Sequence, residues 1–209
     1  MRLEAGNRAG YDVVMPALTV SMGLLGGARV VDSPNCDARP GSINPELIVV
    51  HGISLPPGRF GGPWIDALFT NALPAAEDPY FETIQHLRVS SHVLIGRDGS
   101  LTQYVPFGQR AWHAGSSYWR GRASCNDFSI GIELEGTNED PYDDRQYSAL
   151  ADLVTALQEE YPSLADGWIA GHCDIAPGRK TDPGPAFDWA RLEHELRMRG
   201  AAFRREVLA

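Results

Sequence analysis

The stretch ELIVVH, residues 46–51, is the part of the sequence that best indicates the fold. Four consecutive apolar residues, three of them β-branched, lie between Glu46 and His51. A short apolar run of this kind is typical of a strand that is buried in a sheet. A loop rich in glycine and proline follows. We therefore predict a buried strand that ends at His51, beside a cleft built from loops.

Two more stretches predict strands on either side of the middle of the chain. Residues 91–105, SHVLIGRDGSLTQYV, place Asp98-Gly99 between two apolar runs, which is a strong signal for a β-hairpin. Residues 128–136, FSIGIELEG, alternate between apolar and other residues, as expected for a strand whose two faces differ. The less apolar face of that strand carries Gly131, Glu133 and Glu135.

Helices are predicted at residues 63–71, 79–88, 144–161 and 186–199. The third helix has Asp143 as its N-cap and Gln146 three residues later, which together form a capping box. Gly200 follows the fourth helix as a stop signal. Strands and helices that mix along the chain in this way predict an α/β (α+β) domain with a central mixed β-sheet flanked by helices.

Length, net charge and cysteine content exclude several classes of protein. A chain of 209 residues suits one domain with a sizeable core. Its net charge of −9 argues against nucleic acid and against an anionic membrane surface as partners, and leaves a small-molecule substrate. Its three cysteines are widely spaced and form no CxxC pair, so a disulfide framework is not expected and a cytoplasmic, reducing location fits best.

The ends of the chain are expected to lie outside the folded domain. We predict a poorly ordered N-terminal extension over 1–29, a catalytic domain over 30–200 and a tail over 201–209. The uncharged run 13–28 leaves open an exported form, although acidic residues precede the run and Pro16 interrupts it. The run is too short for a membrane span.

The stretch GHCDIAPGRKTDPGP, residues 171–185, raises the question of a metal site. His172 follows a short apolar run, and Asp182 lies ten residues further on. Together with His51 they make two histidines and a carboxylate, a recognised set of zinc ligands that leaves a fourth position open. Taken singly, each residue has a plainer explanation, such as a hydrogen-bonded histidine or a turn-forming aspartate before proline.

Hydrolysis also needs a base and a group that stabilises negative charge. Glu133 could take a proton from the attacking water, and Glu135 is the competing candidate. Lys180 could donate to a developing oxyanion. Plainer alternatives are solvent-facing strand residues and a solvated lysine. In QRAWHAG, residues 109–115, Trp112 and His113 suit a wall that contacts substrate, although a packed core pair fits the pattern as well.

Four stretches together carry a resemblance to a known family. The stretches are LIVVHGISLPPGRFGGPWIDALFTN, HLRVSSHVLIGRDGSLTQYVPFGQRAWHAG, CNDFSIGIELEGT and GHCDIAPGRKTDPGPAFDW. They resemble the zinc N-acetylmuramoyl-L-alanine amidases, in particular those that act on 1,6-anhydromuropeptides in bacterial cell-wall recycling, and this family shares its fold with peptidoglycan recognition proteins. The resemblance runs from about Val30 to about Arg191.

The resemblance implies one zinc ion per chain, a monomeric cytoplasmic enzyme and an anhydromuropeptide substrate. It implies Glu133, rather than Glu135, as the base and Lys180 as the polarising cation. Arg88 is similar to an arginine that meets a carboxylate of the stem peptide. The ligands implied are His51, His172 and Asp182.

Two positions depart from the family pattern. Gly52 and Ser124 stand where asparagine and arginine are expected, which bears on how the peptide or sugar is held. Three alternatives to the recycling enzyme are an exported amidase for intact peptidoglycan, a non-catalytic peptidoglycan-binding module and a general zinc protease. The third is disfavoured because the sequence has no HExxH motif.

Overall fold

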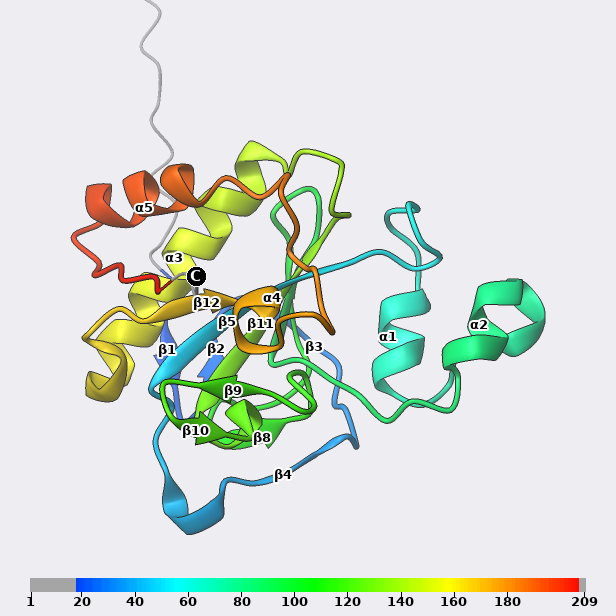
Figure 1. Ribbon diagram of the computed structural model, residues 1–209, viewed down its shortest axis with the longest axis horizontal. Coiled ribbons are helices and arrows are strands. Elements are labelled where there is room, and N and C mark those ends of the chain that lie inside the picture. The colour runs from blue at the N-terminus through cyan, green and yellow to red at the C-terminus, as the bar shows by residue number, and fades with distance from the viewer. Residues whose placement is uncertain (1–17, 207–209) are drawn as a thin grey trace, which may run out of the picture.

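A six-stranded mixed sheet forms the centre of the computed structural model, which describes residues 18–206 (Figure 1). The strand order is β12-β5-β11-β6-β7-β3, and only the β6–β7 hairpin is antiparallel. This confirms the predicted mixed sheet and the hairpin at Asp98-Gly99. The strands are β3 (Arg29–Val30), β5 (Leu47–Ile53), β6 (Val93–Ile95), β7 (Leu101–Gln103), β11 (Ser129–Glu135) and β12 (Ile169–Gly171).

Helices and short ladders surround this sheet. The helices are α1 (Trp64–Phe69), α2 (Pro79–Ile84), α3 (Asp144–Glu160), α4 (His172–Ile175) and α5 (Trp189–Met198). The two-stranded ladders pair β1 (Val20–Ser21) with β2 (Leu24–Leu25), β4 (Cys36–Ala38) with β8 (Gln109–Ala111), and β9 (Tyr118–Trp119) with β10 (Arg122–Ala123). None of the helices between residues 18 and 206 combines the length and apolarity needed to cross a membrane.

Both faces of the sheet are covered, which explains why ELIVVH is apolar without interruption. On one face, Ile48, Val50 and Ile132 belong to the main core together with residues of α3 and α5. On the other face, Leu47 and Val49 belong to a second cluster. Figure 1 shows α1 and α2 at the opposite end of the molecule from α3 and α5, where they form a third cluster.

Local signals placed most helix ends correctly. The predicted capping box at Asp143 and Gln146 is present at the start of α3. The last helix begins at Trp189 rather than at 186, because the Asp188 side chain accepts a hydrogen bond from a backbone amide of its first turn. Helix α2 ends at Ile84 instead of residue 88. Strand β5 continues two residues past the predicted end at His51, because its pairing with β11 extends that far.

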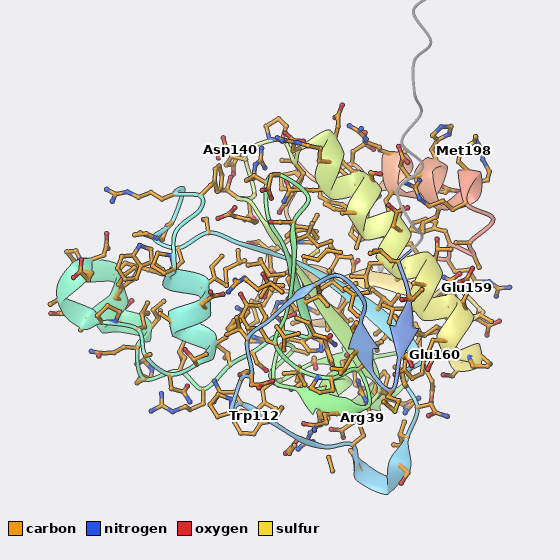
Figure 2. The ribbon with its side chains drawn as sticks, turned by 180° about the vertical axis from the view of Figure 1, so that it is seen from behind. Arg39, Trp112, Asp140, Glu159, Glu160 and Met198 are labelled. Atoms are coloured by element: carbon orange, nitrogen blue, oxygen red, sulfur yellow. The ribbon has the colours of Figure 1, made fainter. Side chains whose placement is uncertain are left out.

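The described part of the N-terminal extension is folded onto the domain, which corrects the prediction of poor order for residues 18–29. Leu25 is 4% exposed within the main core, and its backbone amide donates to Gln103. Figure 2 shows the β1–β2 hairpin beside α3. Residues 1–17 lie outside the described residues. At the other end, the backbone of Arg204 bonds to the segment before β12, so part of the predicted tail is also packed.

Candidate metal centre and its cleft

The structure brings the three predicted metal ligands together at one point. The Nδ1 atoms of His51 and His172 are 2.9 Å apart. Asp182 Oδ2 lies 3.2 Å from the first and 3.0 Å from the second. Ligands of a tetrahedral zinc ion, about 2.0–2.1 Å from the metal, stand about 3.3 Å from one another. A triangle with edges near 3 Å therefore fits three ligands of a single ion with the fourth position open.

Parallel strand pairing brings two of these ligands and the candidate base to the same edge of the sheet. In the ladder between β5 and β11, His51 is the direct partner of Glu133. In the ladder between β5 and β12, Gly171 pairs with Val50, so His172 follows immediately beside His51. The site thus lies at the carboxyl ends of three adjacent parallel strands, where open α/β sheets commonly bind ligands.

The second ring nitrogens of both histidines are also engaged. Nε2 of His172 lies 3.3 Å from the carbonyl oxygen of Ala114, and Nε2 of His51 lies 2.9 Å from Nδ1 of His113. Histidines that bind metals commonly donate their other N–H to a fixed acceptor, which sets the tautomer and the ring orientation. A ring that carries its proton on Nε2 has its Nδ1 lone pair free for the shared point, which is the tautomer that metal binding requires.

The charge states of His51 and Asp182 suit a cation. Burial, and then the nearby His172, lower the pKa of His51 to about 4, so its ring is neutral at pH 7. Burial opposes ionisation of Asp182, but hydrogen bonds from His172 and His51 outweigh it and hold the pKa of this carboxyl well below its usual range. Neutral imidazoles and an ionised carboxylate are the forms that bind metal.

Glu133 presents a carboxylate without a protein partner beside this triangle. Its Oε2 atom is buried and has no hydrogen bond to any described residue. Burial, and then the charge of Asp182, raise the pKa of Glu133 well above its usual range. A buried polar atom left without a partner in a native fold calls for a partner from outside the chain. The donor set and this orphaned oxygen together fit a metal ion with its solvent.

Glu135, the competing candidate, is engaged elsewhere. Its carboxylate accepts hydrogen bonds from the backbone amides of Gly61 and Arg97. It thereby fastens the loop after β5 to the sheet. The geometry consequently favours Glu133 for chemistry and gives Glu135 a structural contact.

A cleft of about 490 Å³ opens above the ligands. One wall is polar and includes Glu133 and the exposed residue Lys180. The apolar part of the lining comes from the region of α1 and α2. Its residues include Leu68, Phe69, Tyr80, Ile84 and Leu87. A cleft with one polar and one apolar wall suits a ligand that has both characters.

The structure does not bring the predicted substrate-contacting residues into this cleft as a group. Arg88 is exposed and donates to the carbonyls of Gln85 and Leu87, outside the residues that line the cleft. The indole of Trp112 donates to Asp37, also away from it. His113 does line the cleft, but it is only 8% exposed and its Nδ1 contacts Nε2 of His51, the ring nitrogen on the side away from the other ligands.

One functional neighbour had no direct sequence signal. Tyr142 donates from its hydroxyl to the carbonyl of Pro183, next to the ligand Asp182. An indirect signal existed in the glycines that surround it: a Cβ at Gly52 or Gly136 would collide with the Tyr142 side chain. Glycine at the end of an apolar strand is a sign of such a close approach.

Known proteins resemble this chain over most of its length. A family model described as N-acetylmuramoyl-L-alanine amidase matches residues 41–185. The chain is 60% identical over 175 residues to the 1,6-anhydro-N-acetylmuramyl-L-alanine amidase AmpD of Escherichia coli, covering 84% of this chain and 95% of the relative. It is 62% identical over 170 residues to AmpD of Citrobacter freundii, covering 81% and 90%.

Solved structures agree with this assignment. A crystal structure of a selenomethionine AmpD derivative superposes with a TM-score of 0.83 at 59% identity, covering 85% of this chain and 98% of that one. A human peptidoglycan recognition protein, at 18% identity and a TM-score of 0.51, shares the fold. The chain belongs to the N-acetylmuramoyl-L-alanine amidase family, as the resemblance of its four sequence stretches implied.

Proposed function

We propose that this protein is a zinc-dependent amidase that cleaves the bond between 1,6-anhydro-N-acetylmuramic acid and L-alanine in muropeptides. The observation that carries the proposal is the triangle of His51, His172 and Asp182 with the half-buried Glu133 beside it, whose buried Oε2 atom has no partner among the described residues. A non-catalytic binding module would have no use for a complete ligand set next to a carboxyl group with a buried oxygen that no described residue contacts.

The residues divide the chemistry among them. A bound zinc ion would lower the pKa of a water ligand to about 7 and polarise the scissile carbonyl. Glu133, whose pKa is raised by burial, is suited to accept the proton of the attacking water and to return it to the leaving amine. Lys180, which lines the cleft, would donate to the oxyanion that develops on the carbonyl.

The choice of substrate rests on the relatives. The names of the two AmpD proteins specify a 1,6-anhydro-N-acetylmuramyl substrate. A structure of Escherichia coli AmiD is titled as a complex with anhydro-N-acetylmuramic acid-L-Ala-D-γ-Glu-L-Lys. It is 26% identical to this chain with a TM-score of 0.53, and the match covers 66% of the AmiD chain. The two-sided cleft of the present chain is compatible with a ligand that joins a sugar to a charged peptide.

We place the reaction in the cytoplasm and in a monomer. The three cysteines are free, which fits a reducing compartment. The three ligands and the base all come from one chain, so the site needs no second subunit. Fractionation of the native host and light scattering of the purified protein would check these two points.

The test is a mass-spectrometric digest of purified anhydromuropeptide, with and without a chelator, alongside Asp182→Ala. We expect release of the anhydro sugar and of the L-Ala-led peptide, lost on chelation and in the variant. A parallel digest of intact peptidoglycan distinguishes the exported type of amidase. Cleavage of intact peptidoglycan alone would reject the proposed substrate, and cleavage that survives both chelation and Asp182→Ala would reject the metal mechanism.

A further inference from the structure

We propose that His113 is a positioning residue: together with Ala114 it forms a bracket that holds both histidine ligands in the tautomer and orientation a metal ion requires. The inference rests on the proposed function only in taking the His51 site to bind metal. It assigns His113 a different role from the contact with substrate that its sequence context suggested.

Hydrogen bonds behind His51 can run in only one direction if Nδ1 of His51 faces a metal. Nε2 of His51 must then carry the proton and donate to Nδ1 of His113, 2.9 Å away. Nε2 of His113 in turn donates to Ser129 Oγ at 3.2 Å. The Ser129 hydroxyl donates to the carbonyl of Cys125 at 2.6 Å. Because a backbone carbonyl only accepts, the chain of donors ends there and fixes the tautomer of each ring.

The same short segment also holds the second ligand. The carbonyl of Ala114 lies 3.3 Å from Nε2 of His172, and Arg179 donates to it as well at 2.6 Å. The Asn126 side chain anchors the segment, because its Oδ1 accepts from the backbone amides of His113 at 3.1 Å and Ala114 at 2.7 Å. Two consecutive residues thus set the rings of both histidine ligands.

A glycine in the central strand makes room for this bracket. Gly131 lies in the middle of β11, where glycine weakens a strand. Its φ lies outside the left-handed region, so its conformation does not explain the residue. A Cβ at this position would instead collide with the imidazole ring of His113. The absence of a side chain at Gly131 is therefore matched to the ring that contacts His51.

The position of His113 favours this role over contact with substrate. Its ring meets that of His51 edge to face, with centroids 5.0 Å apart, and it is 8% exposed. Both of its nitrogens are used within the protein, by His51 and Ser129. His113 borders the cleft, but with both ring nitrogens engaged inside the protein it has no polar atom left for substrate and acts on the reaction through His51.

The test compares His113→Leu with His113→Asn, whose Oδ1 occupies about the place of Nδ1 and can still accept from His51. Zn²⁺ affinity is measured by competition with a chelator, without substrate. Loss of such a partner typically weakens metal binding about 10- to 100-fold, so we expect that loss in the leucine variant and recovery of most of it in the asparagine variant. The visible absorption spectrum of the Co²⁺-loaded protein should change in His113→Leu and stay like that of the wild type in His113→Asn.

Gly131→Ala provides a second approach, because it displaces the His113 ring without removing it. We expect weaker Zn²⁺ binding there too, while thermal melting of the metal-free variants reports any general loss of folding. Wild-type Zn²⁺ affinity in His113→Leu, or equal losses in the leucine and asparagine variants, would overturn the positioning role. Normal metal binding by the wild type without amide cleavage would reject the proposed function and leave the positioning role standing.

Discussion

The metal centre has a half that is carried by the sheet and a half that is carried by a loop. His51 and Glu133 stand opposite each other on β5 and β11, two seven-residue strands paired along their whole length. Asp182 and Lys180 lie in the segment between α4 and α5, which has no regular structure. The same site thus depends on two kinds of support.

The loop is held by individual contacts rather than by a ladder. The carbonyl of Asp182 accepts from the amide of Cys173, and that of Pro183 accepts from Tyr142. The Asn138 side chain donates to Thr181 at 2.7 Å. Each of these contacts can be removed singly, whereas the register of β5 and β11 is fixed by many bonds at once. We therefore expect substitutions of catalytic residues in the sheet half to lower kcat most. Substitutions near the loop half should most easily displace the groups that it carries.

Glu133→Gln should give the largest effect. The amide cannot take a proton from the attacking water, so kcat should fall by about 10²- to 10⁴-fold. Zn²⁺ affinity should change little, because Glu133 is not among the three ligands. Steady-state kinetics on anhydromuropeptide and a metal titration measure the two quantities.

Glu135→Gln is the matched control on the same face of β11. Glutamine retains an oxygen that can accept from the amide of Gly61, so activity should stay within a few-fold of wild type. A fall in kcat for Glu135→Gln as large as that for Glu133→Gln would show that the base has been assigned to the wrong residue.

Gly52→Ala tests how the loop half depends on the sheet half. The new Cβ would collide with the hydroxyl of Tyr142, which holds Pro183 beside Asp182. Because Gly52 is paired with Leu134 in the ladder, the tyrosine and the loop should move rather than the strand. A displacement of about 1 Å at a catalytic group can cost about 10²-fold in rate, so kcat/KM should fall by up to that factor.

Removal of the tyrosine hydroxyl should relieve that collision. In Gly52→Ala/Tyr142→Phe the nearest remaining ring atom, Cζ, would be 3.6 Å from the new Cβ, an ordinary contact. The double variant should therefore be more active than Gly52→Ala alone, with a coupling energy of about 0.5–3 kcal/mol. Strictly additive effects in the double-mutant cycle would show that the two residues do not interact through this contact.

The pH dependence of stability should distinguish Glu133 from an ordinary carboxyl. Burial raises its pKa in the folded protein, so between the ordinary value and the raised one the native state binds more protons than the unfolded state. Stability of the metal-free wild type is then lost as pH rises through this window, by about 1.4 kcal/mol for every tenfold change in proton affinity. Metal-free Glu133→Gln should escape this loss.

Urea unfolding of the two proteins at pH 5 and pH 8, with chelator present, measures the difference. We expect the glutamine variant to gain stability relative to wild type at the higher pH, so the residue that serves chemistry costs stability when no metal is bound. An unchanged difference between the two pH values would mean that Glu133 is ionised as easily as a carboxyl in water.

A local pattern in the sequence supports the sheet half of the site, whereas Asp182 and Lys180 of the loop half were selected by residue type and spacing alone. Apolar runs and alternation placed His51 and Glu133 on strands, because burial on a pleated sheet leaves a periodic pattern. Strand pairing leaves no such local pattern, so their direct opposition in the ladder was not predicted. The role of His113 stayed open in the sequence, because a Trp-His pair beside glycine fits a wall or a core equally well. The distinguishing signal, the missing side chain at Gly131, lies in a different strand.

Asp143→Ala should give the smallest effect. It tests whether a loss of stability at the start of α3 also changes the position of the loop half. Asp143 caps α3 by accepting from the amide of Arg145, and it directly follows Tyr142. Loss of an N-cap costs about 1 kcal/mol, which corresponds to a fall in Tm of about 2–4 °C for a domain of this size. Because the Tyr142 ring is 5% exposed and packs against Phe187, it should keep its place, and kcat/KM should stay at the wild-type value. Thermal melting and kinetics check both expectations. A loss of activity larger than the loss of stability would show that the end of α3, and not only the Tyr142 contact, positions Asp182.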